Sequence, residues 1–130
     1  MPAVVEDEKI KKIKVTSGLK EVSGTDPVTL VTCSIEKRKY VLKKIYIYNP
    51  DTADHVVTIG SYDALGTSWD ADKLPVPVAA GEKVILTEDE IPTDFVMTKD
   101  SSTALMAWAA KLEGAVTANN VLMKIETEVQ

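Results

Sequence analysis

Turn-forming residues interrupt this chain at short intervals, which leaves little room for helices. Glycine and proline, with one Asn-Pro-Asp run, stand at Gly18, Gly24, Pro27, Asn49-Pro50-Asp51, Gly60, Gly66, Pro75, Pro77, Gly81, Pro92 and Gly114. Between them the sequence predicts eight short strands, near residues 9–16, 28–35, 39–48, 55–62, 74–78, 83–88, 103–111 and 120–129. Short strands in this number, without a linker, predict an all-β protein with a single antiparallel β-sandwich or barrel.

Three of these segments alternate apolar and polar residues, as a strand does when one of its faces is buried. In the last segment, one face is apolar apart from a threonine: Val121, Met123, Ile125, Thr127 and Val129. In segment 39–48, two faces are predicted: Val41, Ile45 and Ile47 against Leu42, Lys44, Tyr46 and Tyr48. In segment 55–62, the pattern is weaker: Val57 and Ile59 against Val56 and Thr58. These strands are predicted to supply most of the core.

Segment 103–111 is compatible with either a helix or a strand. Its alanine, leucine, methionine and tryptophan content favours a helix, and serine before it and glycine after it are suitable caps. A period of two instead places Ala107 and Ala109 opposite Trp108 and Ala110, which is typical of a central strand covered on both faces. We favour the strand, with Trp108 buried. Alanines in such a strand would also let a second sheet or subunit approach closely.

The length of 130 residues fits one domain, which we place at residues 9–130. The acidic segment 1–8 has little to bury and is expected to be a mobile N-terminal arm. It also lacks the lysines and apolar core of a signal peptide, so we expect synthesis in the cytoplasm. Asparagine and glutamine total four against fourteen lysines, a composition that hints at a thermophilic source.

Cys33 and His55 are the only cysteine and the only histidine in the chain. An internal disulfide and a Cys/His zinc cluster are therefore both excluded. A nucleophilic Cys33–His55 pair lacks any motif for an orienting group or an oxyanion site, so a small buried hydrophobe is the favoured role for Cys33. No phosphate-binding glycine motif occurs. The sequence thus predicts a protein that is not an enzyme, with no catalytic, cofactor-binding or metal-binding residues and no cofactor.

Basic and acidic residues are distributed unevenly along the sequence. Residues 1–50 carry ten lysines and arginines against six acids, whereas residues 51–130 carry five against fourteen. We expect the lysine-rich segment 9–14 and the run Lys37-Arg38-Lys39 to contact the acidic corner Glu88-Asp89-Glu90 of a neighbouring copy. The alternative is that these charges only solvate loops and strand edges, which protects edge strands from aggregation.

Two ligand-binding alternatives have some support in the sequence. Lysine and arginine alternate with aromatic residues, as in single-strand nucleic-acid binders, at Lys37, Arg38, Lys39, Tyr40, Lys43, Lys44, Tyr46 and Tyr48. The acidic balance, with a pI near 4.9, makes nucleic acid an unlikely partner. A carbohydrate or calcium could be held by a 61–77 loop that contains Tyr62, Trp69 and several aspartates, Asp63, Asp70 and Asp72, with Asp51 and Asp54 nearby in sequence.

A series of strand and turn patterns runs through residues 40–129. A lysine-flanked strand ends in Tyr48-Asn49-Pro50, and the strand His55-Val56-Val57-Thr58-Ile59 follows it. The turn Val78-Ala79-Ala80-Gly81-Glu82 then precedes the strand Val84-Ile85-Leu86. The alanine-rich segment and a final strand from Val121 to Glu128 complete the series. This order resembles small phage and archaeal-virus virion proteins with a jelly-roll-like β-sandwich.

The resemblance implies a non-enzymatic virion structural protein, such as a capsid decoration, minor head or neck or tail component. Its implied partners are copies of itself, possibly as a trimer, and other virion proteins such as the major capsid protein, with no membrane involved. Assembly is expected to bury apolar and alanine-rich surface between copies, while charged rims set the register. The carbohydrate- or calcium-binding module remains the alternative, because sandwiches host both functions.

Overall fold

The computed structural model describes residues 12–33, 39–63, 68–92, 96–98 and 106–130. These residues form ten strands: β1 (Ile13–Thr16), β2 (Lys20–Val22), β3 (Val28–Thr32), β4 (Lys39–Tyr48), β5 (His55–Asp63), β6 (Ser68–Val78), β7 (Lys83–Leu86), β8 (Val96–Thr98), β9 (Met106–Leu112) and β10 (Val121–Val129). No helix in the described part of the chain is long and apolar enough to cross a membrane.

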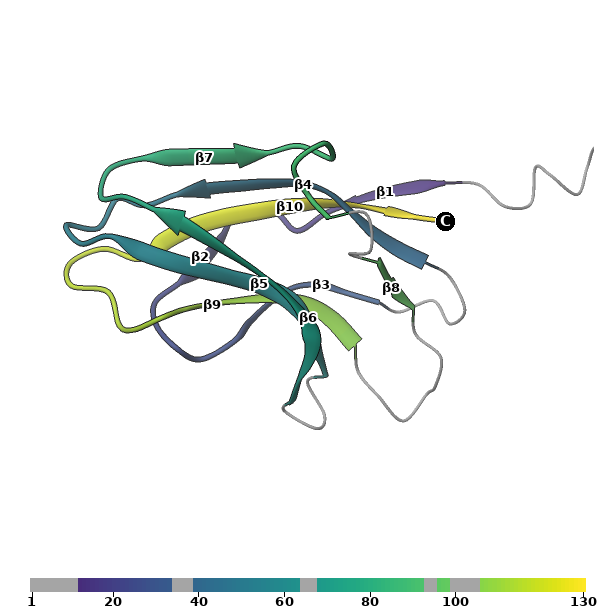
Figure 1. Cartoon of the computed structure of the whole chain (residues 1–130), viewed down its shortest axis with the longest axis horizontal. Helices are drawn as coiled ribbons and strands as arrows, with labels where there is room; N and C mark the ends of the chain where they lie inside the picture. Colours follow the sequence, from purple (N-terminus) through teal and green to yellow (C-terminus); the bar gives the residue numbers. More distant parts are fainter. Residues whose placement is uncertain (1–11, 34–38, 64–67, 93–95, 99–105) are drawn as a thin grey trace, which may run out of the picture.

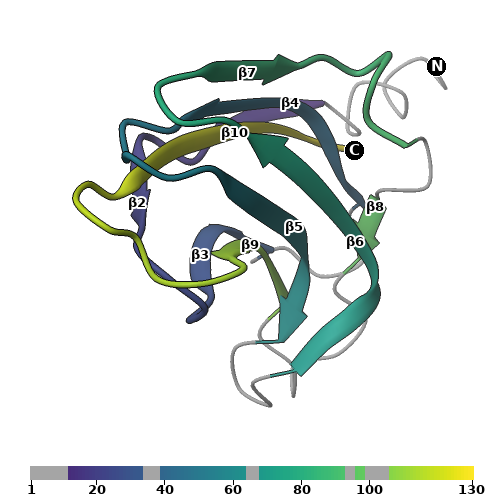
Figure 2. The same cartoon turned by 60° about the vertical axis from the view of Figure 1, so that its left-hand side comes forward.

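The strands form two antiparallel sheets that pack face to face. Sheet A has the order β1-β10-β4-β7, with β2 also paired to β10 and β8 also paired to β4. Sheet B has the order β3-β9-β5-β6. Figure 1 shows sheet A as the upper layer and sheet B as the lower layer, and Figure 2 shows how strongly the long strands of sheet B curve. The predicted antiparallel sandwich is therefore confirmed.

The pairing of strands follows a nested pattern along the sequence. β1 pairs with β10, β3 with β9, β4 with β7 and β5 with β6, and every pairing is antiparallel. This is the path of one long hairpin that is folded over on itself into two sheets, which is the jelly-roll arrangement. The nesting also brings the connections 49–54, 79–82 and 113–120 to the same end of the sandwich (Figure 1).

Each predicted strand has a counterpart among the described residues, including β9 at the ambiguous segment 103–111. Two short strands, β2 and β8, were not predicted, because three-residue segments show no periodicity. β6 begins at Ser68, well before the predicted 74–78. The expected N-terminal arm 1–8, together with residues 9–11, 34–35 and 103–105 of the predicted strands, lies outside the described residues and stays a prediction.

One predicted alternation is wrong, and a β-bulge is the reason. Leu42, not Val41, shares the buried face with Ile45 and Ile47, and its side chain is only 2% exposed. The adjacent residues Glu126 and Thr127 of β10 pair with Lys44 and Leu42, so that Lys43 is an extra residue in β4. One extra residue reverses the inward and outward positions of everything beyond it.

The core lies between the two sheets and contains the alternating residues of β10 and β5 that were predicted to be buried. Val121, Met123, Ile125, Thr127 and Val129 are buried, as are Val57 and Ile59. Trp108 of β9 is 1% exposed and packs within the same cluster, which confirms its predicted burial. Ala107 and Ala109, on the other face of β9, are also fully buried. These two alanines are therefore covered within one chain, and the predicted contact between copies through them is wrong.

Candidate functional site

A buried polar cluster ties together the three connections at one end of the sandwich. Asn49, directly after β4, donates from its side-chain amide to the carbonyl oxygens of Ala53 (2.9 Å) and Val78 (3.0 Å). Its backbone carbonyl accepts from the N–H of Gly81 (2.7 Å), which has a φ of 78° that favours glycine. Its side-chain oxygen accepts from the N–H of Asp51 (3.0 Å), an Asx turn. Asn49 thus anchors its own turn to the β6–β7 connection.

Asp51 connects this turn to the β9–β10 connection. Its side chain is fully buried, and its two carboxylate oxygens accept three backbone N–H groups, from Thr117 (2.9 Å), Ala118 (2.7 Å) and Asn119 (3.1 Å). A fourth hydrogen bond comes from His55 Nε2, at 2.6 Å from Asp51 Oδ2. These four hydrogen bonds stabilise the buried carboxylate, because a buried charge without hydrogen-bond partners lowers the stability of the fold.

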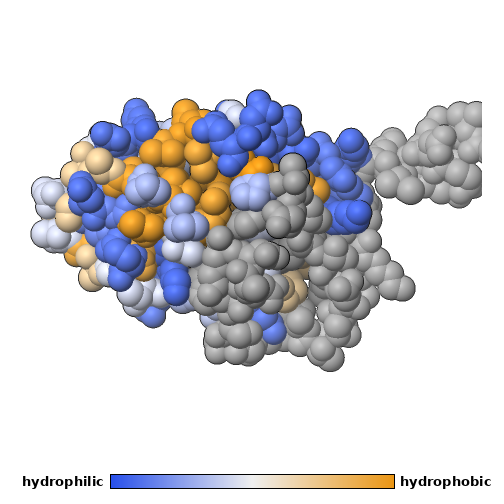
Figure 3. Space-filling model, in the orientation of Figure 1, coloured by the Kyte–Doolittle hydropathy of each residue, from blue (hydrophilic) through white to orange (hydrophobic). Residues whose placement is uncertain are grey.

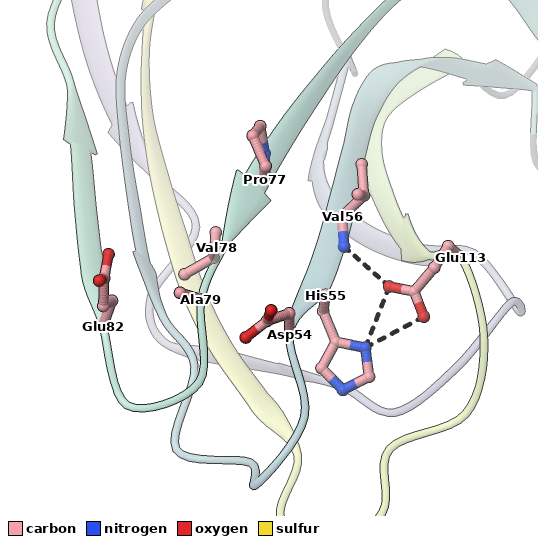
Figure 4. A pocket seen from close by; sticks show the side chains of 8 residues that line it. All are labelled: Asp54, His55, Val56, Pro77, Val78, Ala79, Glu82 and Glu113. Atoms are coloured by element: carbon pink, nitrogen blue, oxygen red, sulfur yellow. Dashed lines mark hydrogen bonds and ion pairs between the residues drawn. The ribbon is translucent and has the colours of Figure 1, made fainter.

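His55 is held between two carboxylates. Its Nδ1 lies 3.0 Å and 3.1 Å from the two oxygens of Glu113, while Nε2 faces Asp51. Glu113 Oε1 also accepts the N–H of Val56 at 2.7 Å (Figure 4). A neutral imidazole carries only one N–H, so only the imidazolium form donates to both carboxylates. The imidazole is buried, whereas the Glu113 side chain is 47% exposed.

The surroundings of the three groups shift their pKa values in opposite directions. Burial alone lowers the pKa of His55, but the hydrogen bonds to Asp51 and Glu113 outweigh it and place the pKa above its usual 6.5. The hydrogen bond from His55, followed by the backbone N–H groups, moves the pKa of Asp51 well below its usual value. For Glu113, burial raises the pKa, but the hydrogen bonds from Val56 and His55 leave it below 4.5. The cluster is therefore charged over a wide pH range.

These shifts predict how the free energy of unfolding varies with pH. A raised pKa for His55 stabilises the fold fully below pH 6.5, and this contribution is lost as the pH rises through the folded-state pKa. The lowered pKa values of Asp51 and Glu113 stabilise the fold above about pH 4.5 and lose that effect at lower pH. We expect the unfolding free energy, from urea titrations, to be greatest between these limits and to fall as the pH rises above 6.5 and through the folded-state pKa of His55. Because His55 is the only histidine, His55→Gln should remove the alkaline slope, and an equal slope in both proteins would contradict the assignment.

The hydrogen bonds of the cluster join three connections of the sandwich. Both ring nitrogens of His55 face carboxylates, so neither can accept a proton from a substrate. The depression beside it has a volume of about 420 Å³ and is lined by Asp54, Pro77 and Glu82 among others, with no serine, threonine, cysteine or lysine in the lining (Figure 4). Cys33 is fully buried, and its N–H bonds the carbonyl of Met106 at the far end of β9 from Glu113. Seven residues at about 3.3 Å each separate those ends, roughly 20 Å, so Cys33 and His55 do not meet.

The tyrosines in the lysine–tyrosine pattern of β4 are either buried or lie beneath a lysine. Tyr40 is buried, with 2% exposure. Lys124 lies over the ring of Tyr46 and Lys83 over the ring of Tyr48, each at 5.5 Å from the ring centroid. These lysines cover ring faces that a nucleic-acid base would need. Lys37 and Arg38 lie outside the described residues.

The predicted 61–77 ligand loop is wrong, because most of this segment is strand. Ser61, Tyr62 and Asp63 belong to β5, and residues 68–77 belong to β6, where Trp69 is the backbone partner of Tyr62. The two nearby aspartates have structural partners: Asp51 lies in the cluster, and Asp54 accepts the N–H of Ala80 (2.9 Å). In the described part of the chain, no group of three or more acidic, histidine or cysteine residues is arranged to hold a metal ion.

The acidic corner Glu88-Asp89-Glu90 makes its contacts within the chain. Lys43 donates to Glu88 at 3.0 Å, and Glu90 accepts from the N–H and the hydroxyl of Thr87 at 3.3 Å and 3.2 Å. Lys12 and Lys14 likewise pair internally, with Glu128 at 3.7 Å and Glu126 at 3.5 Å. Within one copy these residues therefore have other partners than the predicted ones, and the contact between copies stays a prediction.

The Asn49–Asp51–His55–Glu113 cluster was not expected from the sequence. One local signal was available, since the run Asn49-Pro50-Asp51 is typical of an Asx turn and His55 follows Asp51 by four residues. Glu113 is 58 residues from His55, and no sequence pattern indicates that contact. The cluster depends on the jelly-roll nesting, which brings the three connections together.

The chain is a jelly-roll sandwich in which a buried polar cluster holds three connections together at one end. No protein-family model matches the sequence. No curated protein sequence matches it either. Solved structures with partial similarity include a pilus protein of Bacillus endospore appendages, with 16% identity, a TM-score of 0.48 and coverage of 92% of this chain and 84% of that one. Another is the virus-like particle of the extra small virus of the prawn Macrobrachium rosenbergii, with 12% identity, a TM-score of 0.43 and coverage of 92% and 80%. These values are too low to transfer a function.

Proposed function

We propose that this protein is a non-enzymatic structural component of a virus particle. It would decorate a capsid or form a minor head, neck or tail part, associating with copies of itself and with other virion proteins such as the major capsid protein. It would be made in the host cytoplasm and act in the virion.

The observation that carries this proposal is the jelly-roll strand order, β1-β10-β4-β7 facing β3-β9-β5-β6. Viral capsid proteins and lectins are built on this architecture. Fold alone does not specify function, so the residues of the site are needed to distinguish a capsid role from a carbohydrate-binding role. Here both ring nitrogens of His55 are hydrogen-bonded, one to Asp51 and the other to Glu113. The buried polar groups at this end of the sandwich hold the connections in place. An assembly role uses such rigid connections and needs no reacting group.

The carbohydrate- or calcium-binding alternative loses its main support in the fold. Its proposed loop is largely the β5–β6 hairpin, and Asp51 and Asp54 already accept backbone N–H groups. Calcium prefers six to eight oxygen ligands around one point, and carboxylates engaged by N–H donors are poor ligands. The assembly role therefore accounts for more of the described residues.

Light scattering coupled to size-exclusion chromatography tests the proposal. We expect the weight-average mass to rise above 14.1 kDa as the protein concentration increases from micromolar to about millimolar. A ligand that binds the folded state raises the melting temperature. Since we do not expect calcium to bind, its addition should leave the melting temperature unchanged. A strictly monomeric protein at every concentration would contradict self-association, and a calcium-dependent rise in melting temperature would favour the alternative.

A further inference from the structure

The two outer strands of sheet A have unpaired edges. In the described part of the chain, no strand pairs with the outer side of β1 or of β7. Both strands have four residues and contain no proline. β6, the edge strand of sheet B that leads into β7, carries Pro75 and Pro77 within its ladder to β5. Because proline has no N–H to give to β5, its nitrogen faces the free side, and this edge resists addition of a strand. Sheet A has no such protection at β1 or β7.

A row of alternating charges crosses sheet A from one unpaired edge to the other. It begins with Lys12 and Lys14 at β1, continues with Glu128 and Glu126 on β10, then Lys43 on β4, and ends at Glu88 after β7. All six residues line one shallow depression. The hydrogen bond from Lys43 to Glu88 raises the pKa of the Lys43 ammonium, and the charge of Glu128 adds to this effect. Glu128 on β10 and Lys43 on β4 therefore interact electrostatically. This charge row therefore starts with lysine and ends with glutamate.

The strand directions allow the row to continue into another copy. β1, β10, β4 and β7 are joined by three antiparallel pairings, so β1 and β7 run in opposite directions. A copy translated along the sheet and shifted by four residues along the strands presents its β1 antiparallel to β7, because β1 lies level with Glu126–Val129 of β10 and β7 with Leu122–Ile125. The end of β7 at Thr87 and Glu88 then adjoins the start of β1 at Lys12. The glutamate of one copy thus lies beside the lysines of the next.

The apolar residues of the two edges match in the same arrangement. Ile13 and Val15 of β1 pair with buried Val129 and Thr127, so they lie on the core side of the sheet. Val84 and Leu86 of β7 pair with buried Ile47 and Ile45 and lie on that side too. Ile13, on the core side, is 44% exposed, and Ile85, on the outer side of β7, is 50% exposed. Figure 3 shows apolar surface gathered over β7 and the adjoining part of β6, with hydrophilic residues around it.

We propose that copies of this protein join edge to edge, β7 of one copy adding to β1 of the next, so that sheet A and its charge row continue through the assembly. The inference rests on the proposed assembly function and specifies its contact. Such a head-to-tail contact makes a ring if its rotation closes and a filament if it does not. Four-residue strands make each contact weak, so stability comes from many contacts on a particle.

Charge reversal at each edge tests the pairing. Glu88→Lys places lysine opposite the neighbour's Lys12 and Lys14, and Lys14→Glu places glutamate opposite the neighbour's Glu88. Each variant alone should associate at least about tenfold more weakly than the natural protein at low salt, measured by analytical ultracentrifugation. An equimolar mixture should recover association to within about threefold, because the lysine introduced by Glu88→Lys in one copy then faces the glutamate introduced by Lys14→Glu in the next.

Matched variants and a second readout keep the test specific. Asp26→Lys, just before β3 in sheet B, and Lys124→Glu, within β10, change the net charge by the same amounts away from these edges and should leave association unchanged. Melting temperatures of all variants verify folding, since each reversal also disturbs an exposed internal ion pair of small energy. Hydrogen exchange on the concentrated natural protein should show protection gained at residues 13–16 and 83–86.

The possible failures are distinguishable. If the natural protein assembles and the edge reversals assemble equally well, edge pairing is overturned while the assembly function stands. If the reversals weaken assembly but the mixture does not recover it, the β1–β7 pairing is overturned. If the natural protein remains monomeric to about 1 mM, both the pairing and self-assembly are overturned, since the contact supplies no measurable affinity.

Discussion

Trp108→Ala is expected to lower the free energy of unfolding by about 3–5 kcal/mol, because it removes a large side chain from a closely packed core. Trp108 is 1% exposed and lies in the centre of sheet B, where its backbone pairs with Val31 and Ser61. A domain of ordinary stability has about 5–15 kcal/mol to lose, so the variant should be close to unfolding at 37 °C. Urea titration followed by circular dichroism measures the change.

Leu19→Ala is the matched control, since it also truncates a large apolar side chain. Leu19 is 58% exposed, and its truncation should change the unfolding free energy by less than about 0.5 kcal/mol. Trp69 does not serve this purpose, because it lies in β6 and not in the polar loop expected from the sequence. Equal losses for Trp108→Ala and Leu19→Ala would show that the core assignment is wrong.

Asp51→Asn is expected to lower the melting temperature by about 10–20 °C, although it changes a single atom. The carboxylate accepts three backbone N–H groups and His55, four donors in all. An asparagine amide has one accepting oxygen, and its NH₂ group would face donors that need an acceptor. The substitution also leaves His55 with a single carboxylate partner. Differential scanning calorimetry at pH 6, where the cluster is fully charged, gives the clearest comparison.

Asp54→Asn controls for the loss of one negative charge from the same turn. Asp54 is exposed and accepts a single N–H, from Ala80, which an asparagine oxygen can replace. Its melting temperature should stay within about 3 °C of the natural protein. If Asp51→Asn also stays within that range, the cluster does not hold the three connections together.

Local patterns predicted the strands well where burial repeats along one segment. In β10, the alternation from Val121 to Val129 indicates which residues face the core, and the structure agrees. In β4, the same reasoning failed at Lys43, because the bulge is set by pairing with β10, whose sequence is about 80 residues away. The first part of β6, residues 68–73, was missed because its aspartates are typical of loops. Prolines 75 and 77 are tolerated there since β6 is an edge strand.

The sequence by itself determined the all-β class, the segments that form the main strands, the burial of Trp108 and the exclusion of an internal disulfide and of a Cys/His zinc cluster. These follow from periodicity and residue counts, which are local properties. Only the tertiary structure decided the jelly-roll order, the meeting of Asp51, His55 and Glu113, and the charge row from Lys14 to Glu88. Each of these joins residues that are far apart in sequence, and their contact depends on which strands pair. Strand pairing is a property of the whole chain, because it follows from burying both sheets against one core.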